Sequence, residues 1–128
     1  MTDDTHNTEI KKVLLLLKNM VYESTSPLET LRFAKYYRKK GLDVIVVLWG
    51  PMGVLLGKAG KRGGTPKYDE KMEECLNLGV VFRCCRLGSD IIGVNESELI
   101  QGVEIIEAHA VAELFLKYSQ PGHMIISL

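Results

Sequence analysis

The chain has 128 residues, of which 46% are apolar and 25% charged, a composition that predicts a globular protein with a full hydrophobic core. Sixteen Lys and Arg residues balance sixteen Asp and Glu residues, which argues against nucleic acid or an anionic membrane surface as a partner. The longest apolar runs, at 13–17 and 44–49, are far shorter than the roughly 20 residues of a membrane-spanning helix, so we expect no membrane segment.

The first residues of the chain, MTDDTHNTEI, are polar and acidic. We expect residues 1–9 to form a disordered tail and residues 10–128 to form a single domain. The tail has neither the basic nor the apolar region of a secretory signal. Three cysteines cannot all pair within one chain. These features together predict a cytoplasmic protein with reduced thiols.

Five apolar runs are predicted to be β-strands. Two of them, 11–18 and 43–49, are almost continuously apolar, which is typical of strands that are buried on both faces of a parallel sheet. The third, 80–85, is similar, and two shorter candidates complete the set at 103–106 and 124–127. Strands with so little alternation of apolar and polar residues indicate a parallel sheet that is covered by helices.

The stretch 26–41 carries the boundary signals of a helix. Ser26 is a good N-cap residue, Pro27 fits the first turn, and Glu29 completes a capping box. Gly41 follows the expected end of the helix, where a left-handed backbone conformation is common. The sequence therefore predicts a helix between the first two strands.

Two further helices are predicted at 65–79 and 108–122, and helices are expected to fill each gap between strands. The order of elements favours a three-layer α/β/α sandwich with an open, mainly parallel five-stranded sheet, flavodoxin-like in appearance. The residues expected to bound the two helices are Thr65, Pro66, Gly79 and the pair Pro121–Gly122.

Residues 50–66 are expected to lie at the carboxyl edge of the sheet, where open α/β sheets bind their ligands. They include part of a basic, glycine-rich loop at 58–67, which does not match the phosphate-binding pattern G-x-x-x-x-G-K-[ST]. This loop could attract an anionic substrate or an acidic partner, or it could be an ordinary solvated loop. The sequence leaves both interpretations open.

Two adjacent cysteines end the third strand, in the stretch GVVFRCCRLG. Alternation along a strand places Arg83 and Cys85 on one face and Cys84 on the other. Cys85, as the last strand residue, is expected at the carboxyl edge, where Arg83 and Arg86 could stabilise its thiolate form. The other interpretation is that both cysteines only fill space in the core. Cys75 is expected to pack in the core from a helix.

The sequence gives little support for a metal or a cofactor. It contains no Cys-x-x-Cys pair, and its three histidines show no ligand spacing. It also contains no G-x-G-x-x-G motif, so we expect neither a metal nor a dinucleotide cofactor. His109 opens the last helix and could lie near Cys85, although a polar residue is ordinary at a helix start.

Three stretches, taken in their order and spacing, resemble the DsrE/DsrF-like family of small sulfur-relay and related proteins. They are GLDVIVVLWGPMGVLLGKAG, LGVVFRCCRLGSDIIGV and ELIQGVEIIEAHAVAEL, and the resemblance covers nearly the whole chain. In active members, the cysteine that ends the Gly-Val strand carries a persulfide, and the matching position is Cys85. The resemblance also implies trimers or hexamers of like or unlike subunits, with this cysteine near a subunit interface.

Two functions are compatible with these features. In the first, Cys85 takes sulfane sulfur as a persulfide or thiosulfonate and passes it to the thiol of a partner sulfur-carrier protein. In the second, the protein is a non-catalytic oligomeric module that binds a small anionic or nucleotide-like ligand at the carboxyl edge. The residues expected to contact the substrate or ligand are Asn19, Gly50, Pro51, Arg83, Cys84, Arg86 and His109.

Overall fold

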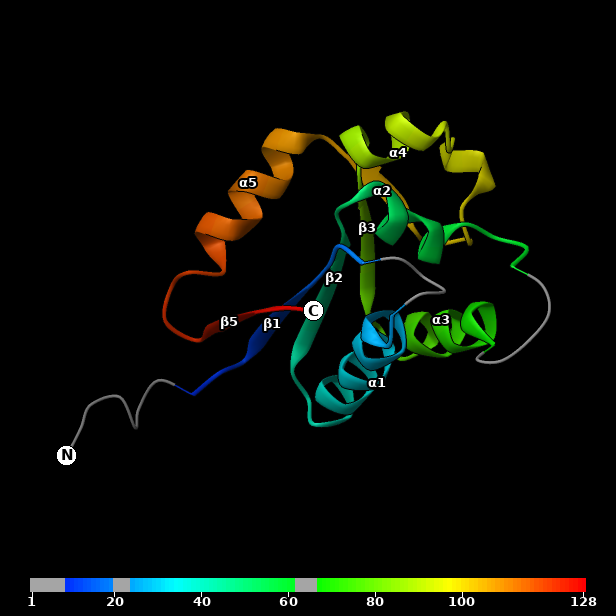
Figure 1. Ribbon diagram of the computed structural model, residues 1–128. Coiled ribbons are helices and arrows are strands. Elements are labelled where there is room, and N and C mark those ends of the chain that lie inside the picture. Colours follow the sequence, from blue (N-terminus) through cyan, green and yellow to red (C-terminus); the bar gives the residue numbers. More distant parts are fainter. Residues whose placement is uncertain (1–8, 20–23, 62–66) are drawn as a thin grey trace.

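The computed structural model describes residues 9–19, 24–61 and 67–128 (Figure 1). The predicted tail at 1–9 therefore falls outside the described residues except for Glu9, which precedes the first strand. The predicted helix start at Thr65 and Pro66 also lies outside them, as does most of the glycine-rich part of the basic loop.

A five-stranded, fully parallel sheet forms the centre of the molecule, in the order β4-β3-β2-β1-β5. The interior strand β1 is buried from Val13 to Leu17 and pairs with β2 on one side and β5 on the other. This arrangement confirms the predicted α/β fold, and each predicted strand is present. Their bounds are β1 Lys12–Leu17, β2 Asp43–Leu48, β3 Val81–Cys85, β4 Glu104–Ile106 and β5 His123–Ser127.

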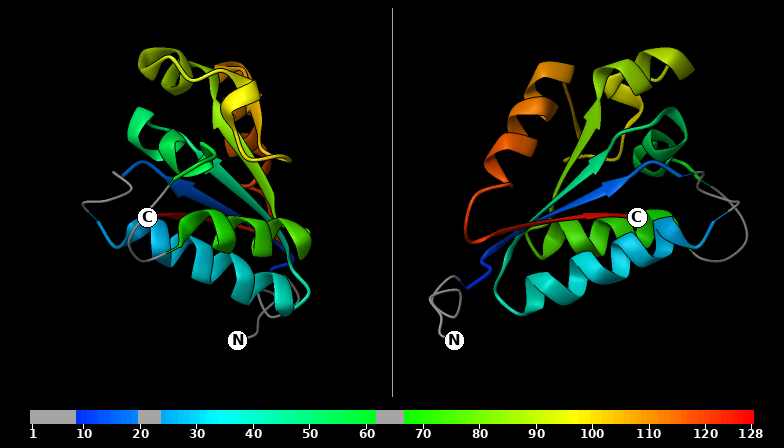
Figure 2. Two further views of the ribbon diagram at one scale, coloured as in Figure 1. Left: turned by 90° about the vertical axis from the view of Figure 1, so that its right-hand side faces the viewer. Right: turned by 60° about the vertical axis from the view of Figure 1, so that its left-hand side comes forward.

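The longer helices cover the two faces of the sheet (Figure 2). The helices α1 (Ser26–Lys39) and α3 (Tyr68–Asn77) lie side by side on one face, and α5 (Ala108–Lys117) lies on the other. Four short elements, of which α2 and α4 pack against each other, complete the chain. They are α2 Pro51–Val54, η2 Leu55–Gly57, α4 Arg86–Ile92 and η3 Glu96–Glu98.

The core is divided by the sheet into two clusters. The larger cluster lies under α1 and α3 and includes Leu31, Met72 and Phe82, all almost fully buried. The smaller cluster lies under α5 and includes Leu14 and Val111. Because alternate side chains of a strand point to opposite faces of the sheet, neighbouring strand residues end in different chemical surroundings.

The predicted cap of α1 is wrong by one residue. Ser26 is the first helical residue and Thr25 is the N-cap, because the Glu29 N–H already donates to the Thr25 carbonyl at 3.0 Å. The Ser26 N–H donates instead to the Ser24 hydroxyl at 3.0 Å, so no capping box forms. At the other end, Gly41 follows the helix with φ +91°, as expected.

The last helix is shorter than the sequence predicts. It ends at Lys117, and residues 118–122 continue as turns in which the Gln120 N–H donates to the Lys117 carbonyl at 3.3 Å. The reason is local, because Pro121 disfavours helical backbone at the residue before it. Gly79 follows α3 with φ +99°, as predicted.

Within the described ranges, none of the helices has the length and apolar character that crossing a membrane requires.

Candidate functional site

The strand β3 runs directly into α4, with Cys85 as the residue between them. Cys85 is the N-cap of α4, and its carbonyl accepts a hydrogen bond of 2.9 Å from the Ser89 hydroxyl. After α4 the chain packs against the α1 side of the sheet through Val94 and Leu99, whereas β4 is followed by α5 on the other side. The connections after β3 and β4 thus leave towards opposite faces, the arrangement at which open α/β sheets form binding crevices.

A hollow of about 290 Å³ opens at this edge of the sheet. Its lining is mostly apolar and combines residues that follow β1 and β2, the last residue of β3, and residues of α2 and α4. Three of the predicted site residues, Gly50, Pro51 and Cys85, lie around it. The full lining is Lys18, Trp49, Gly50, Pro51, Cys85, Leu87, Gly88 and Ile91.

Close backbone packing holds the walls of this hollow in place. A Cβ on Gly88 would lie 2.7 Å from the Trp49 carbonyl oxygen, and one on Gly53 would lie 2.7 Å from the Leu17 carbonyl oxygen. Such distances are shorter than van der Waals contact, so α4 and α2 can approach the strand ends only because both positions are glycine. The glycines fix the position of Cys85 relative to Trp49 and Pro51.

Cys85 and Cys84 differ in what surrounds them. Cys85 is 3% exposed, lies in the cluster under α5 and lines the hollow. Cys84 is fully buried in the other cluster, where a Cβ on Gly57 would come within 3.3 Å of its Sγ atom. Burial, together with the nearby charges of Cys85 and Glu96, raises the pKa of the Cys84 thiol to about 12. Cys84 does not line the hollow, and its expected contact with a substrate stays a prediction.

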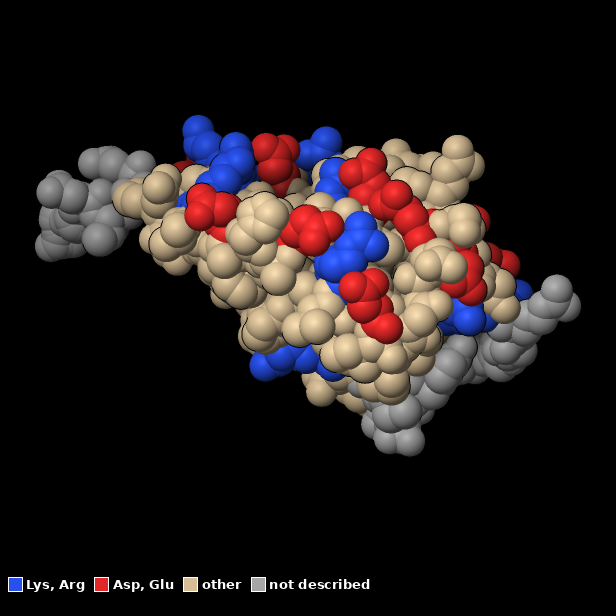
Figure 3. Space-filling model, turned by 90° about the horizontal axis from the view of Figure 1, so that it is seen from above, with Lys and Arg blue, Asp and Glu red and all other residues tan. Residues whose placement is uncertain are grey.

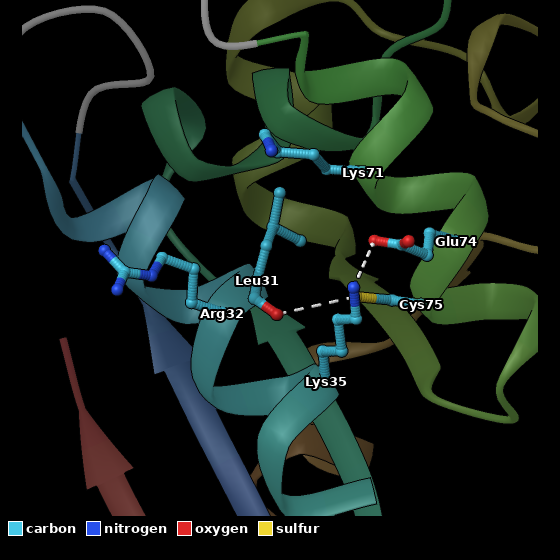
Figure 4. A pocket seen from close by; sticks show the side chains of 6 residues that line it. All are labelled: Leu31, Arg32, Lys35, Lys71, Glu74 and Cys75. Carbon is cyan, nitrogen blue, oxygen red and sulfur yellow. Dashed lines mark hydrogen bonds and ion pairs between the residues drawn. The ribbon is translucent and has the colours of Figure 1, made fainter. Parts of the chain in front are cut away.

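Cys75 lies between α1 and α3 at the floor of a smaller hollow of about 90 Å³ (Figure 4). Its Sγ atom lies 3.5 Å from the Leu31 carbonyl oxygen, and burial and the Glu74 charge raise the pKa of the thiol to about 11. Lys35 reaches across the same hollow to Glu74, with 3.1 Å between ammonium and carboxylate. As predicted, Cys75 belongs to the core. The structure places it on the face of the sheet away from Cys85.

The two arginines beside the cysteines are both paired with glutamates. Arg86 Nε donates to Glu107 Oε2 at 3.1 Å, which connects the start of α4 to the start of α5. Arg83 lies 3.7 Å from Glu104 and donates to the Phe82 carbonyl at 2.9 Å. Neither arginine lines the hollow, so any effect on Cys85 would act through the electrostatic field and not by contact.

Asn19 and His109, two other predicted site residues, lie outside the lining of the hollow. Asn19 follows β1, and its amide donates at 2.8 Å to the Leu128 carbonyl and at 3.2 Å to the Ser26 hydroxyl. His109 is exposed in the first turn of α5. The roles of these two residues stay predictions.

The described part of the basic loop at 58–67 folds back on itself. The Lys61 ammonium pairs with Asp69 and donates to the Leu56 carbonyl at 2.8 Å. Burial lowers the pKa of Lys61, and Asp69 partly opposes this change. The Gly60 N–H also donates to Asp69 at 2.9 Å, so Lys61 ties the loop to α3 and is not free to receive a substrate.

The face that carries α2 and α4 shows blue and red side chains intermingled (Figure 3). A short row of acidic side chains is visible right of the centre of this view, with basic side chains beside it. The described ranges also contain no group of three or more His, Cys, Asp or Glu side chains that could hold a metal ion.

Sequence reasoning missed most of the apolar lining of the hollow. Lys18 and Trp49 directly follow β1 and β2, and this position after a parallel strand was a signal that could have identified them. Leu87 and Ile91 come from α4, whose start has no side-chain cap by which the sequence could predict it. Both are largely exposed, at 62% and 63%.

Comparison with known proteins places the chain in one family. The profile of the DsrE/DsrF-like family matches residues 11–120. An uncharacterized protein of Methanopyrus kandleri, MK0008, is 30% identical over 101 residues, which cover 78% of this chain and 83% of that protein.

Solved structures show the same fold. The ychN protein of E. coli superposes with a TM-score of 0.80 at 23% identity, covering 93% of this chain and all of that one. A protein of unknown function from Methanobacterium thermoautotrophicum, MTH1491, gives a TM-score of 0.67 at 18% identity, covering 94% of this chain and all of that one.

Proposed function

The chain belongs to the DsrE/DsrF-like family, and from this premise we propose that it is a sulfur carrier that holds sulfane sulfur on Cys85. The observation that supports this proposal is the position of the three thiols. Cys85 lines the hollow at the carboxyl edge, whereas Cys84 and Cys75 are buried on the other face of the sheet. Thiols with raised pKa values form little thiolate at neutral pH, which disfavours the other two as nucleophiles.

The proposed reaction is an exchange without net oxidation. The Cys85 thiolate attacks the outer sulfur of a persulfide donor, a new sulfur–sulfur bond forms on Sγ, and the donor leaves as a thiolate. With thiosulfate as donor, the leaving group is sulfite. An acceptor thiolate then attacks the outer sulfur of the Cys85 persulfide, which restores the Cys85 thiolate and transfers the sulfur.

The lining of the hollow suits such an intermediate. A persulfide that forms on a buried thiol between Trp49, Leu87 and Ile91 is shielded from solvent and from unspecific thiols. Lys18 supplies the positive charge in this lining and would attract an anionic donor. In this proposal Arg83 and Arg86 act from outside the hollow by stabilising the Cys85 thiolate and persulfide anions.

The proposal includes an oligomer and a cytoplasmic location. Trp49, Leu87 and Ile91 are exposed beside the hollow, and exposed apolar groups of this size are typical of protein interfaces. We propose that a homotrimer or homohexamer, or a sulfur-carrier protein that delivers its thiol to Cys85, covers this surface.

The test is sulfur loading followed by intact-mass measurement. Reduced protein is incubated with tetrathionate or polysulfide, and Cys85→Ser and Cys84→Ser are treated in parallel. We expect a thiosulfonate or persulfide adduct on the unmodified protein and on Cys84→Ser, and none on Cys85→Ser. Loading of Cys85→Ser to the normal extent would contradict the proposal.

A second candidate is a non-catalytic binding module. The hollow of about 290 Å³ is close to the lower size limit of small-molecule sites, and its apolar walls with one lysine would suit a small anion with an apolar body. In that case Cys85 would load no sulfur, and Lys18→Ala would weaken binding of the ligand.

A further inference from the structure

A second concave surface lies on α1, on the other face of the sheet from Cys85. It is a groove of about 390 Å³, a size within the range of small-molecule sites. The helix contacts α3 through a different side, where Leu31 accepts from Cys75, Lys35 pairs with Glu74 and Arg38 donates to the Leu78 carbonyl. The groove is lined by Arg32, Phe33, Tyr36 and Tyr37.

Three aromatic rings form most of this groove. Phe33 and Tyr37 meet edge to face with 6.2 Å between ring centroids, and Tyr36 and Tyr37 do so with 5.9 Å. Phe33 and Tyr37 pack against the core and are held there, but Tyr36 is 58% exposed and belongs to neither core cluster. Burial of Tyr36 in the core therefore does not explain this aromatic residue.

Two positive side chains lie beside the exposed Tyr36 ring. The Lys40 ammonium lies over this ring, 5.5 Å from its centre, and Arg32 lines the groove two turns earlier on the helix. The eight residues between Arg32 and Lys40 correspond to a helix rise of about 12 Å. Glu29 is the only acid of α1 and pairs with Arg32 at 3.1 Å. Because Arg32 is 69% exposed, this ion pair is weak and can be exchanged for an anionic ligand.

We propose that this groove binds a nucleotide, with its base stacked on Tyr36 and its phosphate paired with Arg32 or Lys40. A planar base can stack on the exposed Tyr36 ring in place of the Lys40 ammonium, and a phosphate fits the positive charge of Arg32 or Lys40. The helix rise of about 12 Å between these two residues allows the base to lie between them while one of them holds the phosphate. This binding is independent of the sulfur chemistry proposed for Cys85.

The test is to titrate isotope-labelled protein with AMP and to monitor the amide chemical shifts of α1 by NMR. We expect shifts that saturate and are confined to the groove. Base stacking contributes about 1–3 kcal/mol, so Tyr36→Ala should weaken binding at least about fivefold, whereas Tyr36→Phe should keep it. Arg32→Ala should weaken binding and reduce its dependence on salt. Since Tyr36 and Arg32 are exposed, these variants should fold normally.

Matched controls come from α5, where Leu116→Ala and Lys117→Ala remove an exposed apolar side chain and a cation from the other face. Both should leave AMP binding unchanged, as should Cys85→Ser. A short oligothymidylate distinguishes a free nucleotide from a nucleic-acid strand as the ligand. Much tighter binding of the strand to the same residues would assign the groove to single-stranded nucleic acid.

Three outcomes would overturn the proposal. The first is the absence of saturable shifts with AMP. The second is equal affinity for AMP and inorganic phosphate that Tyr36→Ala does not change, because charge alone would then explain binding. The third is that the chemical shifts of the groove residues change with protein concentration but not with AMP, because a second copy of the chain would then occupy the groove.

Discussion

Cys84 and Cys85 are neighbours in the chain, yet the sheet separates their side chains. Cys84 is surrounded by the core under α1 and α3, with Gly57 against its sulfur atom. Cys85 lies in the smaller core under α5 and forms part of an open hollow. A step of one residue along a strand thus changes a packing side chain into one that a ligand can reach, because alternate residues face opposite sides.

The largest expected difference between the thiols is in their rate of alkylation. With a pKa of about 12, Cys84 is ionised in about one molecule in ten thousand at pH 8, and Cys75, with a pKa of about 11, in about one in a thousand. Both are also covered by the core. We expect iodoacetamide to modify Cys85 more than about a hundredfold faster than either. Peptide mapping by mass spectrometry over time would measure this, and equal rates would remove the distinction on which the sulfur-carrier proposal depends.

The next effect concerns the walls of the hollow. Gly88→Ala places a Cβ against the Trp49 carbonyl, so α4 must move away from the strand end. Overpacking of this kind costs typically about 1–3 kcal/mol in the free energy of unfolding. We expect lower stability in urea unfolding and slower sulfur loading of Cys85, whereas alkylation of Cys84 in the folded state should stay slow. Full stability in Gly88→Ala would show that α4 adapts without cost.

Alkaline pH should lower the free energy of unfolding through the two thiols that are buried on the α1 side of the sheet. Cys75 and Cys84 have pKa values above their usual 9.0 in the folded state, so the unfolded chain loses their protons at lower pH than the folded chain does. Stability is therefore complete below about pH 9 and falls as the pH rises towards 11 and 12. Urea unfolding at about pH 7.5, 9 and 10.5 would follow this decline.

The control for the alkaline decline is a pair of variants, Cys75→Ala and Cys84→Ala, each of which should reduce the slope of stability against pH. Burial also raises the pKa of Tyr118, with Asp43 contributing, so part of the decline should remain in both variants. Tyr118→Phe should remove that part. An unchanged slope in all three variants would contradict the assignment.

The smallest expected effect comes from the surface ion pair between Arg86 and Glu107. Both side chains are about half exposed, and such pairs contribute about 0–1 kcal/mol. We expect Arg86→Gln to change the midpoint of urea unfolding little but to slow alkylation of Cys85 at low salt. High salt should reduce the difference. A rate that is equal in both proteins at low salt would exclude Arg86 from the electrostatics of Cys85.

The sequence was sufficient for the sheet but not for the hollow. Continuous apolar runs identify buried strands because both faces of a parallel sheet are covered, and alternation along β3 separates Cys84 from Cys85. A helix was expected between β3 and β4, but the bounds of α4 were not predicted, because α4 follows Cys85 without a polar cap and exposes Leu87 and Ile91. The pairing of Arg86 with Glu107 depends on the meeting of two distant segments, which no local pattern records.

The order of the strands has a consequence for how the protein is made. The interior strand β1 leaves the ribosome early, but one of its two partners, β5, is synthesised last, and Lys12 aligns with His123. Until β5 arrives, the apolar β1 has one unpaired edge, and such edges promote association with other chains. Contacts between residues so far apart in the chain also form slowly. Removal of β5 should therefore increase aggregation during synthesis, even though β5 lies far along the chain from Cys85.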